Sequence, residues 1–311
     1  CNNTSYDKVN SQTNQKEGEL KCEKPIGVLF EGLDINKFNK KSPDCMDIKT
    51  SKILENISEE FCFLFTGHWL PGNLGEDRKN VGLMVKTFLK TFKGSSKKPA
   101  LILKTNSVNY SILDKEGIIS QIQKIKKELG ENLPNIYLIH GEMTDKELNL
   151  LNNDPKVKSF ISFTKGEGFG RPLLEQAITG KPVITTNWSG HIDFLKPDYN
   201  ILLGGELKNV EESSANNWLL KDSQWFNVNT EIASRALKDV FKHYKKYIKK
   251  SRKQTQYLKN NFSLDNMTKT LNNFLPDVKQ APQMQELKLP KLTKKTKPTE
   301  LKLPKLKKIK V

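Results

Sequence analysis

The sequence has few cysteines and no long apolar run. Four cysteines occur in 311 residues, and none forms a closely spaced pair, so the pattern indicates neither a zinc site nor a disulfide framework. No apolar stretch is long enough to cross a bilayer, and no signal peptide is visible at the start, which is Cys1. We therefore expect a cytoplasmic protein without a metal site.

Acidic residues are also scarce, because 35 Asp and Glu face 52 Lys and Arg, a net charge of +17. Such an excess suits nucleic acid or an anionic membrane surface. Residues 279–311 hold 11 lysines and two glutamates, and the unit ELKLPKL occurs there twice, at 286–292 and 300–306. We predict that residues 277–311 form a disordered Lys-rich tail. Its role is either to solubilise or tether the protein or to bind an anionic surface. The tail has no aromatic residue for base stacking, so nucleic acid is the less favoured partner.

Residues 25–276 alternate between apolar, strand-like runs and helical patterns. The predicted strands are Ile26–Phe30, Phe61–Thr66, Ala100–Lys104, Asn135–Ile139, Val157–Phe163, Pro182–Thr186 and, more weakly, Asn200–Leu203. The predicted helices are Lys79–Phe92, Glu116–Leu129, Asp145–Leu151, Arg171–Thr179, Gly190–Leu195, Asn229–Lys250 and a last one from Ser263 to Leu275. This alternation predicts an α/β domain, a doubly wound parallel sheet that binds ligands at the carboxyl ends of its strands. The polar residues 1–24 are predicted to be a flexible connector.

The most informative segment is KGEGFGRPLLE, residues 165–175, which joins a strand to a helix. Gly168 and Gly170 allow the backbone to approach a ligand closely. The helix that follows presents free N–H groups, which suit a phosphate. Glu167 and Glu175 flank this loop, and carboxylates accept hydrogen bonds from sugar hydroxyls. The combination favours a sugar nucleotide, against the alternative of a solvated loop acid and a helix-surface acid.

The stretch from Glu167 through Thr186 and on to Phe194 resembles the donor-site signature of family 4 glycosyltransferases, which are retaining enzymes of the GT-B fold. The resemblance implies a Rossmann-like C-terminal half of a GT-B enzyme. It also implies that Glu167 contacts the donor sugar, that the amides around Phe169 and Gly170 contact the diphosphate, and that Glu175 contacts the ribose.

The resemblance extends upstream, because residues 28–38 are similar to the segment that opens this half in the family. In the family, an arginine after a strand glycine and a later lysine hold the diphosphate. Lys79 matches the lysine, whereas His68, after Gly67, stands at the arginine position. Arg78 is a candidate for the missing charge, and an ordinary loop histidine is the alternative for His68.

Two further positions fall near the same sheet edge. Lys104 ends a predicted strand, and it either touches the donor or is a solvated lysine. His191 and Asp193 lie in a loop on the donor side, where capping by a polar residue explains Ser189 and Asp193 equally well.

The function that the resemblance implies is transfer of a sugar from a UDP- or GDP-sugar to a hydroxyl of a glycan, lipid or protein acceptor. The configuration would be retained, and neither a metal nor a cofactor would be needed. Glu167 would orient the sugar, and Lys79 would stabilise the leaving diphosphate. No N-terminal acceptor-binding half is recognisable, so we expect a hexosyltransferase fragment that binds its donor but is inactive alone. The alternatives are a non-catalytic nucleotide-sugar or carbohydrate-binding module and a nucleic-acid-binding protein.

A basic helical segment covers residues 237–262. Its apolar stripe of Leu237, Phe241, Tyr244 and Ile248 opposes a lysine-rich face. The stripe predicts core packing with a solvated back face. The alternative is weak contact with an anionic membrane, which would make the protein membrane-peripheral.

Overall fold

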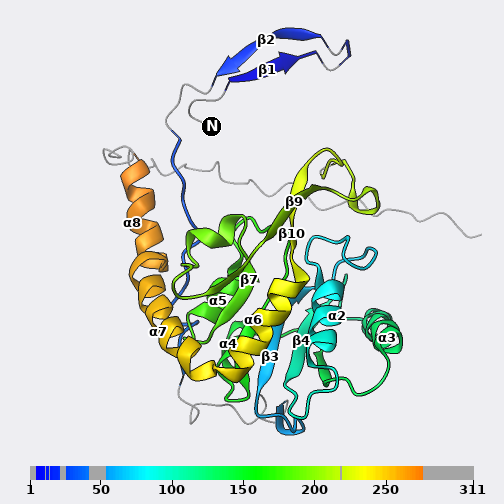
Figure 1. The fold of residues 1–311 in the computed structure, drawn as a ribbon. Coiled ribbons are helices and arrows are strands. Elements are labelled where there is room, and N and C mark those ends of the chain that lie inside the picture. The colour runs from blue at the N-terminus through cyan, green and yellow to red at the C-terminus, as the bar shows by residue number, and fades with distance from the viewer. Residues whose placement is uncertain are drawn as a thin grey trace, which may run out of the picture. The chain divides into compact units, whose positions relative to one another are not determined.

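The computed structural model describes residues 5–10, 12–13, 15–21, 26–41, 54–217 and 219–275 (Figure 1). The predicted tail at 277–311 lies outside these described residues.

The core is one parallel sheet of six strands in the order β5-β4-β3-β6-β7-β8. The strands are β3 (Cys62–His68), β4 (Ala100–Asn106), β5 (Ile136–Ile139), β6 (Val157–Ile161), β7 (Val183–Thr186) and β8 (Ile201–Leu203). From β3 the chain builds outward through β4 and β5, and it then returns to add β6 on the other side. This reversal makes the crevice between β3 and β6 the topological switch point, where doubly wound sheets bind ligands.

Helices cover both faces of the sheet (Figure 1). Alternate β3 residues point to opposite faces: Phe63 and Phe65 pack with one group of helices, and Cys62 and Leu64 with the other. The first group is α2 (Val81–Phe92), α3 (Ile112–Leu129) and α6 (Thr230–Lys242). The second is α4 (Asp145–Asn153), α5 (Arg171–Ala177) and α7 (Tyr244–Asn261), after which α8 (Leu264–Phe274) follows. The predicted doubly wound α/β fold is thus confirmed.

Local sequence sets where these helices begin. Thr144 and Glu147 form a reciprocal capping box at α4. The Asn229 side chain accepts hydrogen bonds from the first turn of α6, and Ser111 does the same for α3. These caps place the helix starts within a few residues of the predicted ones.

Three predicted elements were wrong. Residues 26–30 form no strand, and Val28 is 81% exposed. The backbone at Gly27 lies close to the Phe274 ring of α8, so this segment packs against that helix instead of joining the sheet. The long predicted helix at 229–250 is divided, since His243 leaves helical geometry between α6 and α7. The predicted helix at 190–195 is a single 3₁₀ turn, η2 (Gly190–Asp193).

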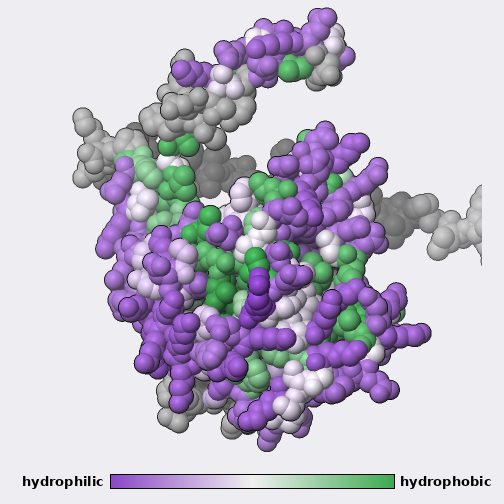
Figure 2. Space-filling model, in the orientation of Figure 1, coloured by the Kyte–Doolittle hydropathy of each residue, from purple (hydrophilic) through white to green (hydrophobic). Residues whose placement is uncertain are grey.

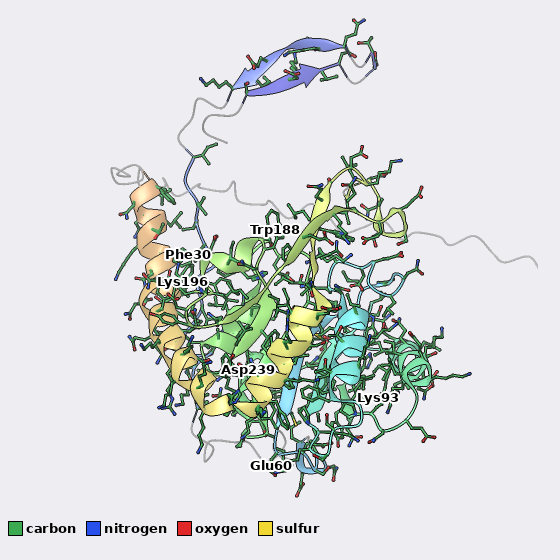
Figure 3. All side chains as sticks on the ribbon, in the orientation of Figure 1. Phe30, Glu60, Lys93, Trp188, Lys196 and Asp239 are labelled. Atoms are coloured by element: carbon green, nitrogen blue, oxygen red, sulfur yellow. The ribbon has the colours of Figure 1, made fainter. Side chains whose placement is uncertain are left out.

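Two antiparallel hairpins were not predicted (Figure 1). One joins β1 (Ser5–Val9) to β2 (Lys16–Lys21), within the segment expected to be a flexible connector. Ion pairs between the strands, such as Lys16 with Asp7, accompany this polar pairing. The other joins β9 (Gly205–Asn209) to β10 (Gln224–Val228), with the 3₁₀ turn η3 (Glu212–Ser214) between them. Figure 3 places Trp188 beside this hairpin, where its ring stacks on Phe226.

Candidate functional site

The carboxyl ends of β3 and β6 bring together three residues that the sequence singled out. Glu167 lies on the loop after β6, and its Oε1 is 2.7 Å from the Lys79 ammonium. The Arg78 guanidinium lies 3.3 Å from the other oxygen of Glu167 and donates to the Gly166 carbonyl at 2.8 Å. Two cations from the segment before α2 therefore hold a carboxylate 88 or 89 residues further along the chain.

Glu167 is ionised at neutral pH although its side chain is only 11% exposed. Burial by itself raises the pKa of this carboxyl. The Lys79 charge, hydrogen bonds from Lys79 and Thr164, and the Arg78 charge outweigh burial and lower the pKa below its ordinary value. The site thus combines one fixed negative charge with two adjacent positive ones.

A second loop braces the Glu167 loop from behind. The Ser189 hydroxyl accepts from the Glu167 N–H at 2.7 Å and donates to the Glu167 carbonyl at 2.8 Å. The Gly190 N–H donates to the same carbonyl. A Cβ at Gly190 would lie 1.9 Å from the Gly168 oxygen, so only glycine fits this approach. The alternative in which the Ser189 side chain caps a helix is wrong, because its hydroxyl makes no cap bond and instead joins the two loops.

The amides of the glycine-rich loop are available to a ligand. Within the described part of the chain, the N–H groups of Gly168, Phe169 and Gly170 donate to no protein acceptor. Gly170 has φ +95°, a left-handed conformation that favours glycine, and it precedes Pro172 in the first turn of α5. The Phe169 ring is turned into the core against Phe194, which fixes the loop backbone.

A small hollow with polar and apolar walls lies where these groups meet. Its volume is about 10 Å³, roughly the space of one water molecule. Its polar lining is Thr66, Lys79, Ser162, Glu167 and the backbone of Gly170, and its apolar lining is Phe65, Phe160, Pro172 and Leu173. Among the described residues, the buried Thr66 hydroxyl has no hydrogen-bond partner. The hollow therefore accommodates a single polar group, and most of a larger ligand would lie outside it.

Glu175 is placed differently from Glu167. It lies on α5 with a side chain 7% exposed, and it accepts a 2.8 Å hydrogen bond from Arg171 one turn earlier in the same helix. Burial raises the pKa of Glu175, and the Arg171 contacts only partly oppose this. Glu175 does not line the hollow, and it is not the helix-surface acid of the alternative interpretation. Contact with a ribose stays a prediction.

Gly67, His68 and Lys104 lie at the same sheet edge, but none of them contacts Glu167. His68 is exposed and ends β3 in register with Asn106 of β4. Lys104 is buried, and its ammonium donates to the Gly141 carbonyl at 2.7 Å beside the Tyr110 ring. Burial lowers the pKa of Lys104, although Glu142 partly offsets it. Lys104 is thus not a solvated lysine, and its role toward a donor remains untested.

His191, which the sequence placed only in a nearby loop, is fully buried. Its Nε2 lies 2.7 Å from the Thr186 carbonyl and must donate to it, which leaves Nδ1 as an acceptor. Among the described residues Nδ1 has no partner. Burial lowers the pKa of His191, so the imidazole is neutral at pH 7.

Sequence reasoning missed Lys165, which is completely buried. Its ammonium lies 3.1 Å from both Glu211 oxygens and 4.1 Å from the centre of the Trp225 ring. Its backbone N–H donates to the Arg78 carbonyl, and its own carbonyl accepts from Phe226. One residue therefore joins the Glu167 loop to the segment before α2 and to the β9–β10 hairpin. A lysine directly after an apolar run is the only sequence signal for it.

The described ranges contain no group of three or more His, Cys, Asp or Glu side chains that could hold a metal ion. No helix within them is long and apolar enough to cross a membrane. The surface over α7 is largely hydrophilic in the view of Figure 2. Contact of this helix with an anionic membrane stays a prediction.

No family model matches the sequence, and no curated protein matches it. Solved structures do. The C-terminal domain of a group 1 family glycosyltransferase, LpcC from Francisella tularensis, matches with TM-score 0.52 and 13% identity over 75% of this chain and 100% of that domain. Anabaena HepE, solved in complex with UDP and glucose, matches with TM-score 0.54 and 13% identity. The match covers 80% of this chain and 56% of the HepE chain.

A glycosyltransferase from Rickettsia africae matches with TM-score 0.55 and 16% identity. The match covers 82% of this chain and 57% of the Rickettsia chain. The chain thus spans slightly more than half the length of the HepE and Rickettsia chains. At these identities the likeness concerns the fold. The chain has the Rossmann-like fold of the C-terminal domains of GT-B glycosyltransferases.

Proposed function

We propose that this chain is the donor-binding domain of a glycosyltransferase and that it holds a nucleoside-diphosphate sugar at the β3–β6 crevice. The pairing of Glu167 with Lys79 and Arg78 beside three loop amides without protein acceptors is the observation that carries the proposal. Cations and free amides are what a diphosphate needs, and an ionised carboxylate suits sugar hydroxyls. HepE, which shares the fold, has been crystallised with UDP and glucose.

The cations, more than the helix dipole, support diphosphate binding. Helix α5 has only seven residues, so its dipole is small. Lys79 is 13% exposed, and a charge in that environment acts on a diphosphate more strongly than a solvated one does. Arg78 provides a planar guanidinium that can bind two phosphate oxygens.

The proposed chemistry follows from where charge develops. When the sugar leaves the diphosphate, negative charge grows on the leaving oxygens, and Lys79 and the loop amides would stabilise it. Glu167 would hold the sugar in position through its hydroxyls. We propose retention of configuration and a hexose donor, as in family 4, with an acceptor held by a second domain.

Calorimetric titration with UDP-glucose and GDP-mannose tests the proposal. We expect saturable binding of one of the two. Lys79→Gln should weaken it roughly tenfold or more, because one charge-assisted hydrogen bond contributes about 1.5–3 kcal/mol. Glu167→Gln should weaken binding of the nucleotide sugar more than binding of the free nucleoside diphosphate, since its role is toward the sugar.

Lys8→Gln is a matched control, because Lys8 pairs with Glu17 in the exposed β1–β2 hairpin. It removes the same charge and should leave affinity unchanged. A folded chain that binds neither nucleotide sugar at millimolar concentration would contradict donor binding. Tight binding that Lys79→Gln and Lys8→Gln weaken equally would place the ligand elsewhere.

A further inference from the structure

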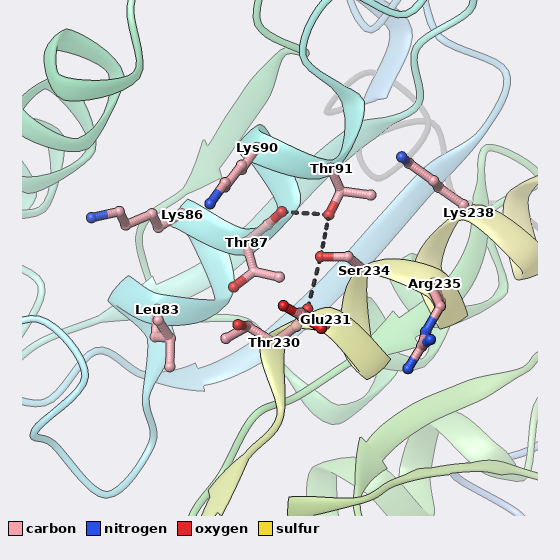
Figure 4. A pocket seen from close by; sticks show the side chains of 10 residues that line it. All are labelled: Leu83, Lys86, Thr87, Lys90, Thr91, Thr230, Glu231, Ser234, Arg235 and Lys238. Carbon is pink, nitrogen blue, oxygen red and sulfur yellow. Dashed lines mark hydrogen bonds between the residues drawn. The ribbon is translucent and has the colours of Figure 1, made fainter.

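A second hollow lies between α2 and α6 and shares no lining residue with the one at Glu167 (Figure 4). Its volume is about 490 Å³, which falls within the range typical of small-molecule sites. It runs along the later turns of α2 and the first turns of α6.

The hollow exists because the two helices meet through small hydroxyl side chains. The Thr91 hydroxyl lies 3.0 Å from the Ser234 hydroxyl, which itself donates to the Thr230 carbonyl at 2.8 Å. Larger apolar residues at these positions would fill the space between the helices. The contact instead leaves a floor of polar groups.

Basic residues from both helices line this groove. Lys86 and Lys90 stand one turn apart on α2, and Arg235 and Lys238 stand on α6. Glu231 is the one acid in the lining. Cations spaced three or four residues apart on one helix repel each other, so an anion bound between the helices would relieve that repulsion.

Most of these basic side chains form no salt bridge within the described residues. Lys86 pairs with Glu128 of α3. Across the described ranges, Lys90, Arg235 and Lys238 have no carboxylate within salt-bridge distance. All three are exposed at the rim. Within the described residues, the groove therefore has three cations without a carboxylate partner.

Hydroxyl donors complete the lining. Thr87 is buried in the floor and Thr230 is half-buried at the start of α6. In the described part of the chain, neither hydroxyl makes a hydrogen bond. Lysine, arginine and hydroxyl donors around a concave space are the groups that recognise phosphate oxygens.

We propose that the α2–α6 groove binds a compact polyanion, a small molecule that carries two or more phosphate groups. The groove lining contains no aromatic side chain, so base stacking does not contribute and a single-stranded nucleic acid is the poorer fit. The site is separate from the proposed donor site and does not depend on it.

The test uses the whole chain and sodium tripolyphosphate as the probe, with sodium chloride at matched ionic strength as the reference. We expect saturable binding by calorimetry. Lys90→Gln combined with Arg235→Gln should lower the affinity at least about tenfold, because both changes remove charge-assisted hydrogen bonds. Tripolyphosphate also fits the proposed diphosphate site, so every titration is repeated in the Lys79→Gln background, where binding at the α2–α6 groove should persist.

Lys249→Gln combined with Lys253→Gln is the matched control, since both lysines are exposed on α7 and the net charge changes equally. It should alter affinity less than twofold. Equal loss in both double variants, or no binding beyond the chloride reference, would refute the proposal. Binding of a single-stranded oligonucleotide without binding of tripolyphosphate would also overturn it. Circular dichroism checks that each variant is folded.

Discussion

Glu167 and Glu175 are both buried carboxylates eight positions apart, yet their surroundings are opposite. Glu167 faces two cations from a distant segment, and its pKa is lowered. Glu175 has one cation from its own helix, and its pKa is raised. Lys79 is 13% exposed, whereas Arg171 is 57% exposed and its charge is largely screened by water.

The difference teaches that burial alone does not make a carboxylate an active group. A buried carboxylate stays charged when nearby cations or hydrogen bonds outweigh the cost of burial, and a cation that is itself shielded from water, as Lys79 is, is an effective partner. Among the two, only Glu167 has such a partner, and only Glu167 lines the hollow. The comparison therefore favours Glu167 as the residue that meets a ligand, and it can be tested at three levels.

The largest expected effect comes from the brace behind Glu167. Gly190→Ala should destabilise the fold by about 3 kcal/mol, because a Cβ 1.9 Å from the Gly168 oxygen forces the loop to move. Gly117→Ala in α3 is the control. Its Cβ would meet no atom within 4 Å, so alanine should stabilise the helix by about 0.5–1 kcal/mol. Urea denaturation measures both, and equal midpoints would mean that the loops can separate freely.

The next effect compares the two acids directly. Glu167→Gln leaves the nearly buried Lys79 ammonium without a carboxylate, and we expect a loss of about 2 kcal/mol in the free energy of unfolding. Glu175→Gln keeps an acceptor for Arg171 and removes a charge that burial already disfavours. Its cost should be within about 0.5 kcal/mol. A larger loss for Glu175→Gln would reverse the comparison.

The smallest effect concerns protonation of His191. Because the pKa of His191 is lowered in the folded state, the unfolded chain binds more protons just below pH 6.5. Stability should therefore fall as the pH drops below about 6.5. His191→Gln, which retains a donor for the Thr186 carbonyl, should flatten this part of the profile.

The same histidine can sharpen the comparison. The Glu167 charge raises the pKa of His191, and Glu175 is not among the groups that act on it. Titration followed by NMR should show a lower His191 pKa in Glu167→Gln and an unchanged one in Glu175→Gln. Equal values in both variants would indicate that the Glu167 charge does not reach His191.

Much of the fold could be predicted from sequence because each central strand is a short apolar run between turn signals. Phe61–Thr66 and Pro182–Thr186 match β3 and β7 within two residues. The run at 26–30 is also short and apolar, but it lies against Phe274 of α8 and forms no strand, which composition does not reveal. Strand β9 gave no apolar signal because it faces solvent along its whole length, whereas Trp225, Phe226 and Val228 of β10 are buried.

The sequence identified individual site residues but not the contacts between them. Lys79 and Glu167 were each identified from a motif, whereas their contact joins segments 88 positions apart. The resemblance assigned Glu167 to the donor sugar and Glu175 to the ribose, but spacing does not show which carboxylate has a buried partner. Lys165 gave no usable signal, since its partners Glu211 and Trp225 belong to the unpredicted hairpin.

The placement of Lys165 has a practical consequence. An ammonium 4.1 Å from the Trp225 indole, attached to the loop that carries Glu167, makes the emission of that tryptophan sensitive to any displacement of the loop. With the other three tryptophans of the sequence replaced by phenylalanine, the chain would contain its own fluorescent sensor of ligand arrival and would need no attached dye.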